Sequence, residues 1–214
     1  MKLPLIAAVP PPPRLSVELA NLRDRSAERA VTLREVIYVL GARAYMLLVL
    51  LLSLPFITPI PLPGLSTPFG LAIALIALRL SLGQRPWLSM KLQRKELPAG
   101  FISRVFALAE RVLRFFEKFL RPRLTFLTDT PRLAQLHAVL MLVAALVLLL
   151  PLPIPFTNSF PAWTIMLLAA GLLERDGVFI LAGYVVFAAG VLYFVFLGEA
   201  TASLLHQLTQ WLRG

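Results

Sequence analysis

The stretch Ala44–Leu78 decides the fold: AYMLLVLLLSLPFITPIPLPGLSTPFGLAIALIAL has 35 residues and no charge. As one straight helix it would extend about 52 Å, far beyond the roughly 30 Å hydrocarbon core of a bilayer. Five prolines and Gly64 interrupt it. Proline lacks an N–H and clashes with the preceding turn, so helix cannot continue through this region. The stretch therefore predicts two apolar arms joined by a proline-rich turn.

A second stretch, 138–173, repeats this design with 36 uncharged residues. Four prolines break it, and Thr157-Asn158-Ser159 supplies polar turn groups. Each arm has roughly 11 to 18 strongly apolar residues, whereas a full span needs about 20. The two hairpins are therefore either re-entrant or fully spanning. Full spans would have to be extended into flanking residues such as Arg43 or His137.

The two stretches also align with each other when the chain is shifted by 94 residues. Pro59-Ile60-Pro61 then falls on Pro153-Ile154-Pro155, and Gly83 falls on Gly177. Leucine-rich segments match by composition, so the shared Pro-Ile-Pro carries more weight than the apolar identities. The match predicts an internal repeat around broken helices, as occurs in transporter folds. Because each hairpin is expected to begin and end on the same side, parallel repeats are favoured.

The segment Gly177–Gly198 has 22 uncharged residues and no proline, which predicts one complete transmembrane helix over 178–198. Gly183 and Gly190 allow close helix approach. That approach would be either packing within the chain or contact in a homodimer. Residues 199–214 form an amphipathic tail that we expect along a membrane surface.

Composition separates a membrane protein from a nucleic-acid-binding protein. The net charge is +10, but 58% of residues are hydrophobic and only 15% are charged. The mean hydropathy is +0.80. The hydrophobic fraction is above the average of soluble domains and the charged fraction is below it. We therefore expect an integral membrane protein that binds no nucleic acid. With no cysteine and two histidines, thiolate and multi-histidine metal sites are excluded, and no metal or cofactor is expected.

A basic connection, 79–132, joins the hairpins with 12 basic and four acidic residues, a net +8. The positive-inside rule predicts that it is cytoplasmic. Within it, Phe101–Leu120 has two adjacent apolar stripes opposite Arg104, Arg111 and Lys118. This pattern predicts an interfacial helix whose basic arc contacts anionic lipid headgroups. The alternative is a helix packed on the protein's own cytoplasmic face.

The expected fold class is an all-α integral membrane protein with two repeated hairpins, one C-terminal transmembrane helix and amphipathic interfacial helices. The predicted segments are a proline-rich and polar N-terminal region, the first hairpin, the basic segment, the second hairpin, the transmembrane helix and the tail. Their bounds are 1–31, 32–83, 84–132, 133–177, 178–198 and 199–214.

No catalytic residues are predicted. The sequence contains no phosphate-binding G-x-x-x-x-G-K-S/T loop, no G-x-S-x-G elbow and no H-E-x-x-H pair. The candidate membrane site consists instead of the proline turns with two ionisable residues at equivalent repeat positions. Its members are Pro59, Pro61, Pro63, Gly64, Pro153, Pro155, Asn158, Arg43 and His137.

Two polar features of this set have open alternatives. Asn158 either contacts a ligand or caps the following helix. Arg43 and His137 are candidates for function at membrane depth or are simply interfacial. Beside the last span, Glu174, Arg175 and Asp176 form a polar cluster, which is either a charged helix end or a cytoplasmic gate.

Five passages together resemble the ExoD family of bacterial exopolysaccharide-synthesis membrane proteins. They are Pro-Leu-Pro-Gly-Leu-Ser-Thr at 61–67, Gly-Gln-Arg-Pro-Trp-Leu at 83–88, Arg-Pro-Arg-Leu-Thr-Phe-Leu-Thr at 121–128, Pro-Ile-Pro-Phe-Thr-Asn at 153–158 and Gly-Leu-Leu-Glu-Arg-Asp-Gly at 171–177. Their order and spacing carry the resemblance, over roughly residues 30–200. It implies a multi-pass protein of the bacterial inner membrane that supports exopolysaccharide production, and it supplies no catalytic residues.

Three functions remain open at this point. The first is a non-enzymatic protein of exopolysaccharide synthesis or export with a lipid-linked or anionic substrate. The second is a scaffold that docks other synthesis proteins through its basic cytoplasmic face. The third, a small membrane enzyme on a lipid-linked sugar, is least favoured because the catalytic patterns named above are absent from the sequence.

Overall fold

The computed structural model describes residues 20–21, 24, 43–59, 64–84, 99–150 and 154–213. The expected all-helical fold is confirmed, because the described residues contain no strand beyond one isolated bridge. The chain divides into two compact units: residues 1–41 with 89–115, and residues 42–88 with 116–214. Both proline turns and the candidate functional residues outside 89–115 belong to the second unit.

The first broken stretch forms helix α3, Arg43–Ser53, and helix α4, Ser66–Ser81. Helix α3 ends in a single 3-10 turn, η1, Leu54–Phe56, where Pro55 prevents continuation of the α-helix. Helix α4 ends at Gly83, whose φ of +68° suits glycine. The Gln84 amide then donates to the carbonyl of Arg79 at 2.9 Å, which closes the helix end.

The second broken stretch forms helix α8, Pro131–Leu148, and helix α9, Ser159–Glu174. A short helix, α7, Phe126–Asp129, precedes them. Proline at the first position of α8 suits a helix start, since its missing N–H would be unsatisfied there anyway. Helix α9 ends at Arg175, which adopts a left-handed conformation with φ of +58°. The four arms contain between 11 and 18 residues, as the sequence predicts.

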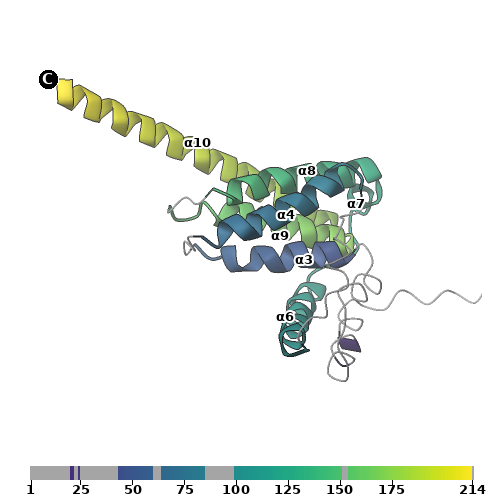
Figure 1. The fold of residues 1–214 in the computed structure, drawn as a ribbon. Coiled ribbons are helices and arrows are strands. Elements are labelled where there is room, and N and C mark those ends of the chain that lie inside the picture. The colour runs from purple at the N-terminus through teal and green to yellow at the C-terminus, as the bar shows by residue number, and fades with distance from the viewer. Residues whose placement is uncertain are drawn as a thin grey trace, which may run out of the picture. The chain divides into compact units, whose positions relative to one another are not determined.

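Helix α9 lies at the centre of the second unit, in contact with α3, α8 and α10 (Figure 1). Eleven of its 16 residues are buried, most of them small or aliphatic. Helix α4 packs along α8. Each hairpin's first arm therefore packs along the second arm of the other hairpin. Both hairpins begin and end at one end of this unit, and their proline turns lie at the opposite end (Figure 1).

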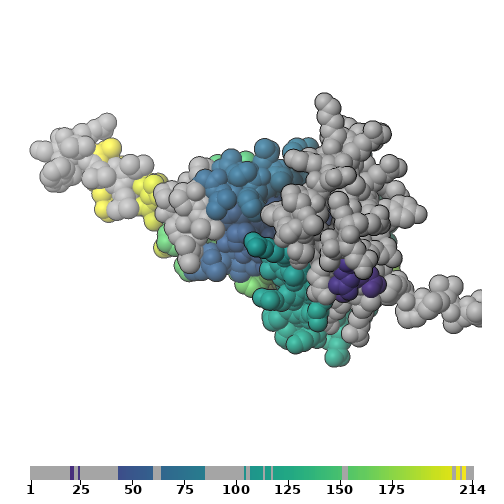
Figure 2. Space-filling view, turned by 60° about the horizontal axis from the view of Figure 1, so that its bottom comes forward, coloured from purple at the N-terminus to yellow at the C-terminus, as the bar shows by residue number. Residues whose placement is uncertain are grey.

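Helix α10 runs without interruption from Gly177 to Arg213. The transmembrane segment and the tail that the sequence distinguishes thus belong to one helix. Its last part extends past the other helices of its unit (Figures 1 and 2). Both predicted close-approach glycines face α9: a Cβ on Gly183 would lie 2.9 Å from Leu168, and one on Gly190 would lie 3.1 Å from Phe160.

Two helices are long and apolar enough to cross a membrane, namely α8 and the part of α10 from Gly177 to Ser203. Large apolar side chains remain exposed along one stripe of each, which is unfavourable in water and suits a lipid environment. The exposed residues of α8 are Leu136, Val139, Val143 and Leu146, and those of α10 are Val178, Leu181, Val185, Val191, Leu192, Val195 and Phe196.

In the first unit, helix α6 covers Ala99–Glu117 and matches the predicted amphipathic helix to within three residues. Arg104 and Arg111 are exposed, as expected of the basic arc. The side chain of Glu110 is buried and forms an ion pair with Arg114. An i, i+4 pair satisfies that buried carboxylate within the helix.

Candidate functional site

A polar junction closes the end of the second unit where the hairpins begin and end. We call it the latch and define it as residues 121–124 together with 175–177. The Asp176 side chain is 1% exposed. One of its oxygens accepts from the Arg121 amide at 3.0 Å, and the other accepts from the Val178 amide at 2.9 Å. Asp176 thereby caps the start of α10 and holds the segment before α7.

Backbone geometry tightens the latch further. The Gly177 amide donates to the carbonyl of Arg123 at 2.7 Å. A Cβ at Gly177 would lie 2.6 Å from the backbone oxygen of Leu124, closer than real Cβ contacts. This position therefore requires glycine because two backbones approach each other. The shift of the chain by 94 residues pairs Gly177 with Gly83. Gly83, however, follows the end of α4 with a positive φ, so the two glycines have different roles.

The predicted cluster Glu174, Arg175 and Asp176 is thus divided in the structure. Asp176 is buried and bonded to backbone, whereas Arg175 is exposed and forms an ion pair with Asp129 at 2.5 Å. Glu174 lies in the last turn of α9 and is half-buried. The arrangement holds the α9–α10 turn against α7, and this mixed-charge helix end corresponds to the first of the two alternatives.

His137 lies inside α8 and not at its start, and it is 1% exposed. One ring nitrogen lies 2.9 Å from the hydroxyl of Tyr184 and the other 2.9 Å from the carbonyl oxygen of Leu127. Both nitrogens of His137 are thus occupied within the protein. Arg43, its predicted equivalent, is the first residue of α3 and is half-buried.

The opposite end of the unit, which we call the proline-turn end, comprises residues 57–59, 64–66 and 154–160. The Ser159 hydroxyl donates to the carbonyl of Thr58 at 3.0 Å. The indole of Trp163 donates to the carbonyl of Ile57 at 3.2 Å. These two bonds tie the first proline turn directly to the helix that follows the second. Of the predicted site residues, Pro59, Gly64 and Pro155 are exposed here, and Pro61, Pro63 and Pro153 lie outside the described residues.

Asn158 is the exception at this end, because it is 8% exposed and makes no side-chain capping bond to α9. Within the described part of the chain its Oδ1 atom has no hydrogen-bond partner, and the same holds for the hydroxyl of the fully buried Ser66. Leaving a buried polar group unpaired costs about 1–3 kcal/mol. The capping alternative for Asn158 is therefore wrong in this structure.

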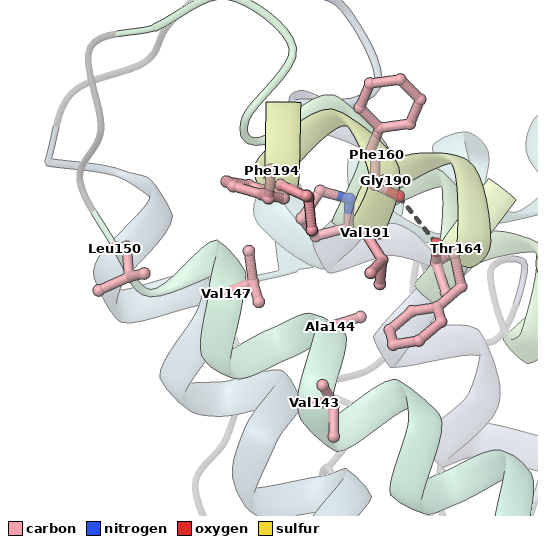
Figure 3. A pocket seen from close by; sticks show the side chains of 12 residues that line it. Val143, Ala144, Val147, Leu150, Phe160, Thr164, Gly190, Val191 and Phe194 are labelled. Carbon is pink, nitrogen blue, oxygen red and sulfur yellow. Dashed lines mark hydrogen bonds between the residues drawn. The ribbon is translucent and has the colours of Figure 1, made fainter. Parts of the chain in front are cut away.

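A groove of about 400 Å³ opens beside the proline-turn end, between α8, α9 and α10 (Figure 3). Its walls are almost entirely apolar, and its one side-chain hydroxyl, on Thr164, donates to the carbonyl of Phe160 at 2.9 Å. The lining residues are Val143, Ala144, Val147, Leu150, Phe160, Pro161, Thr164, Phe187, Gly190, Val191, Phe194 and Val195.

Sequence reasoning missed three aromatic residues that hydrogen-bond at these sites: Trp163, Tyr184 and Tyr193. The Tyr193 hydroxyl donates to the carbonyl of Pro155 at 2.7 Å. The signal in the sequence was the hydroxyl of tyrosine and the indole N–H of tryptophan within apolar segments, because these groups usually find a hydrogen-bond partner when they are buried. No group of three or more potential metal-ligating side chains occurs among the described residues.

Comparison with known proteins adds independent findings. Residues 15–196 match the family described as "Exopolysaccharide synthesis, ExoD". The chain is 34% identical to Protein ExoD of Rhizobium meliloti (strain 1021) over 183 residues, which is 85% of this chain and 75% of that protein. It is 31% identical to an uncharacterized protein of Synechocystis sp. (strain ATCC 27184 / PCC 6803 / Kazusa) over 94% of this chain and 96% of that protein. No solved structure matches the chain.

Two of the five passages that carry the resemblance meet in the latch. Arg121–Thr128 supplies the backbone that Asp176 and Gly177 hold, and Gly171–Gly177 supplies those two residues. This contact joins segments about 55 residues apart. The backbone approach at Gly177 and the buried carboxylate of Asp176 each restrict which residue type fits there.

Proposed function

Because the chain belongs to the ExoD family, whose description is exopolysaccharide synthesis, we propose that it is a non-enzymatic membrane protein that supports the synthesis or export of an exopolysaccharide. In this proposal it binds a lipid-linked or anionic substrate at the proline-turn end. The bound groups would be unpaired polar atoms of the two turns, with Asn158 as the principal contact.

The observation that carries this proposal is the buried, unpartnered Oδ1 of Asn158 at the point where the two turns meet. The bond from Ser159 to Thr58 brings the turns together. A broken helix at membrane depth is tolerated where its backbone lines a cavity or is buried in protein. An acceptor without a partner is suited to a ligand's hydroxyl or amide donor, and this accounts for keeping an asparagine there.

The test is Asn158→Ala, with exopolysaccharide yield and thermal unfolding in detergent measured on the same variant. We expect the yield to fall while the unfolding temperature stays within a degree or so of the parent, because no bond within the protein is lost. The control is its neighbour Thr157, whose hydroxyl donates to the carbonyl of Ile154 at 2.7 Å. Thr157→Val should lower stability. An Asn158→Ala variant with normal yield would rule out the substrate contact.

The proposed location is the bacterial inner membrane, with several crossings. Two observations support this location. Helices α8 and α10 each expose a stripe of large apolar side chains. The first arm of each hairpin packs along the second arm of the other, so the two hairpins would lie in the membrane together. The basic segment 79–132 would face the cytoplasm, and the end of α10 would lie outside it. Since the chain has no cysteine, Ser89→Cys and Ser203→Cys each introduce a single thiol for labelling. Labelling of the Ser89→Cys variant from outside intact cells, or failure to label the Ser203→Cys variant, would contradict this topology.

We further propose that α6 contacts anionic lipid headgroups. Arg104, Arg111 and Lys118 are exposed, and so are the apolar side chains of Leu108 and Phe115. Each basic residue near an anionic surface contributes about 1 kcal/mol. A peptide covering 99–120 should bind anionic vesicles more tightly than a variant with these three residues changed to glutamate. Equal binding of the two peptides would contradict the headgroup role.

A further inference from the structure

The groove beside the proline-turn end is placed where a membrane lipid can reach it. Two of its three walls are α8 and α10, the helices that are long and apolar enough to cross a membrane. Val143 on α8 and Val191 and Val195 on α10 line it and are each more than 40% exposed. The groove is therefore open to the medium that surrounds these helices, and in a bilayer that medium is hydrocarbon.

The chemistry of the walls selects the occupant. Thr164 already donates its hydroxyl to Phe160, so the lining side chains offer no free polar group to a sugar, phosphate or headgroup. Apolar cavities of this kind remain dry and take up apolar molecules. The volume of about 400 Å³ lies within the roughly 300–1,000 Å³ of ordinary ligand sites.

We propose that this groove binds one hydrocarbon chain of a membrane lipid, with the polar head of that lipid at the proline-turn end. The position of the lipid's polar head rests on the proposed function, whereas the binding of its hydrocarbon chain rests on the groove alone. Leu150 and Phe160, which line the groove, directly flank the second proline turn (Figure 3). Phe160 is two residues from Asn158, and Tyr193 ties the turn to α10. A lipid with its chain in the groove would thus have its head beside the unpartnered amide.

This placement defines the substrate class more narrowly than the proposed function does. A free anion or a soluble sugar would use only the proline-turn end and leave the groove without effect. A lipid-linked molecule would use both, and burial of its apolar chain in the groove would strengthen its binding. The groove therefore predicts that the substrate carries a long apolar chain.

The experiment uses the full chain in lipid nanodiscs and a long-chain alkyl phosphate that carries a diazirine in the middle of its chain. After irradiation, labelled residues are mapped by mass spectrometry. In the unmodified protein we expect label concentrated around 143–147 and 191–195. Val139 on α8 and Val185 on α10 are also exposed but do not line the groove, and they should be labelled several-fold less. Equal labelling of groove and control positions would overturn the proposal.

Matched variants then test the groove by filling it. Val191→Trp is compared with Val185→Trp on α10, and Val143→Trp with Val139→Trp on α8. Each groove variant should lose label several-fold at the groove residues of the other helix, whereas each control should keep it. The thermal unfolding temperature is measured for all four. Undiminished label in both folded groove variants would overturn the proposal.

Failure of the proposed function would give a different result. If Asn158→Ala left exopolysaccharide yield unchanged while Val191→Trp abolished chain labelling, the head site would be refuted and the chain site supported. If Asn158→Ala reduced yield but labelling were uniform, the chain site would be overturned and the proposed function retained.

Discussion

The two ends of the second unit satisfy their buried polar groups differently. At the latch, both carboxylate oxygens of Asp176 accept backbone hydrogen bonds. Outside the latch, both ring nitrogens of His137 lie within hydrogen-bonding distance of a partner. At the proline-turn end, the hydroxyl of Ser66 and Oδ1 of Asn158 have no partner among the described residues. The polar groups of Asp176 and His137 thus have partners within the protein, whereas Ser66 and Oδ1 of Asn158 have none within the described part of the chain.

This difference predicts a structural role for the latch and a binding role for the proline-turn end. A satisfied polar network fixes one arrangement and stabilises it, whereas an unsatisfied buried group lowers stability unless something else binds it. The latch holds the end where the chain passes between helices, and both oxygens of its Asp176 are already bonded to backbone amides. The proline-turn end retains acceptors, and it adjoins the apolar groove. Mutations at the two ends should therefore affect different measurements.

The largest effect on stability is expected from Asp176→Ala. Hydrogen bonds to a charged group contribute about 1.5–3 kcal/mol each, and this substitution removes two of them from a buried site. We expect the free energy of unfolding in detergent to fall by about 3 kcal/mol or more. The control is Asp129→Ala, which removes an exposed ion pair with Arg175 and should cost at most about 1 kcal/mol. Similar losses in the two variants would contradict the buried latch.

Gly177→Ala should give the next largest loss. The added Cβ would lie 2.6 Å from the backbone oxygen of Leu124, so the α9–α10 turn and the segment before α7 must separate. Overpacking of this kind typically costs about 1–3 kcal/mol. Gly198→Ala, on the same helix, adds a Cβ with nothing within 4 Å and should stabilise the helix by about 0.5–1 kcal/mol. Opposite signs of the two changes in unfolding free energy are the expected result.

A smaller loss is expected from Tyr184→Phe. The change removes the hydroxyl beside the buried His137 and should cost about 1 kcal/mol, the usual contribution of a single hydrogen bond. Tyr193→Phe removes a hydroxyl bonded to the exposed Pro155 carbonyl, which can find another donor. Its cost should be clearly smaller in the same detergent unfolding assay. A larger loss for Tyr193→Phe would indicate that the proline-turn end is the more rigid of the two.

The helical fold follows from the sequence because its signals are local. Runs without charge predict the arms, proline predicts the breaks, and the pattern over Phe101–Leu120 predicts α6 to within three residues. The continuity of α10 through Gly198 does not follow, since glycine and Glu199 weaken a helix signal without ending a helix.

The sites could be predicted only in part, because they depend on contacts between distant segments. Asn158 is predictable as a polar residue in an apolar turn, but its lack of a partner depends on the packing around it. Asp176 stands out in sequence as a charge beside a span, yet its partner is a backbone amide 55 residues earlier, which no side-chain pattern encodes. The groove depends on the close packing of α10 on α9 at Gly190.

The smallest stability effect is expected in a comparison of two fully buried serines on either side of the first proline turn. Ser53 donates its hydroxyl to the carbonyl of Leu50 at 2.8 Å, whereas the Ser66 hydroxyl has no partner within the described residues. Ser53→Ala removes a bond made in the native state and should cost about 1 kcal/mol. Ser66→Ala removes an unpaired polar atom, so the free energy of unfolding should stay the same or rise by up to about 1 kcal/mol. Both variants keep the helix and differ from the parent by one oxygen atom, so packing changes are closely matched. A loss for Ser66→Ala equal to that for Ser53→Ala would mean that Ser66 is bonded in the folded protein, and the contrast between the two ends would then rest on Asn158.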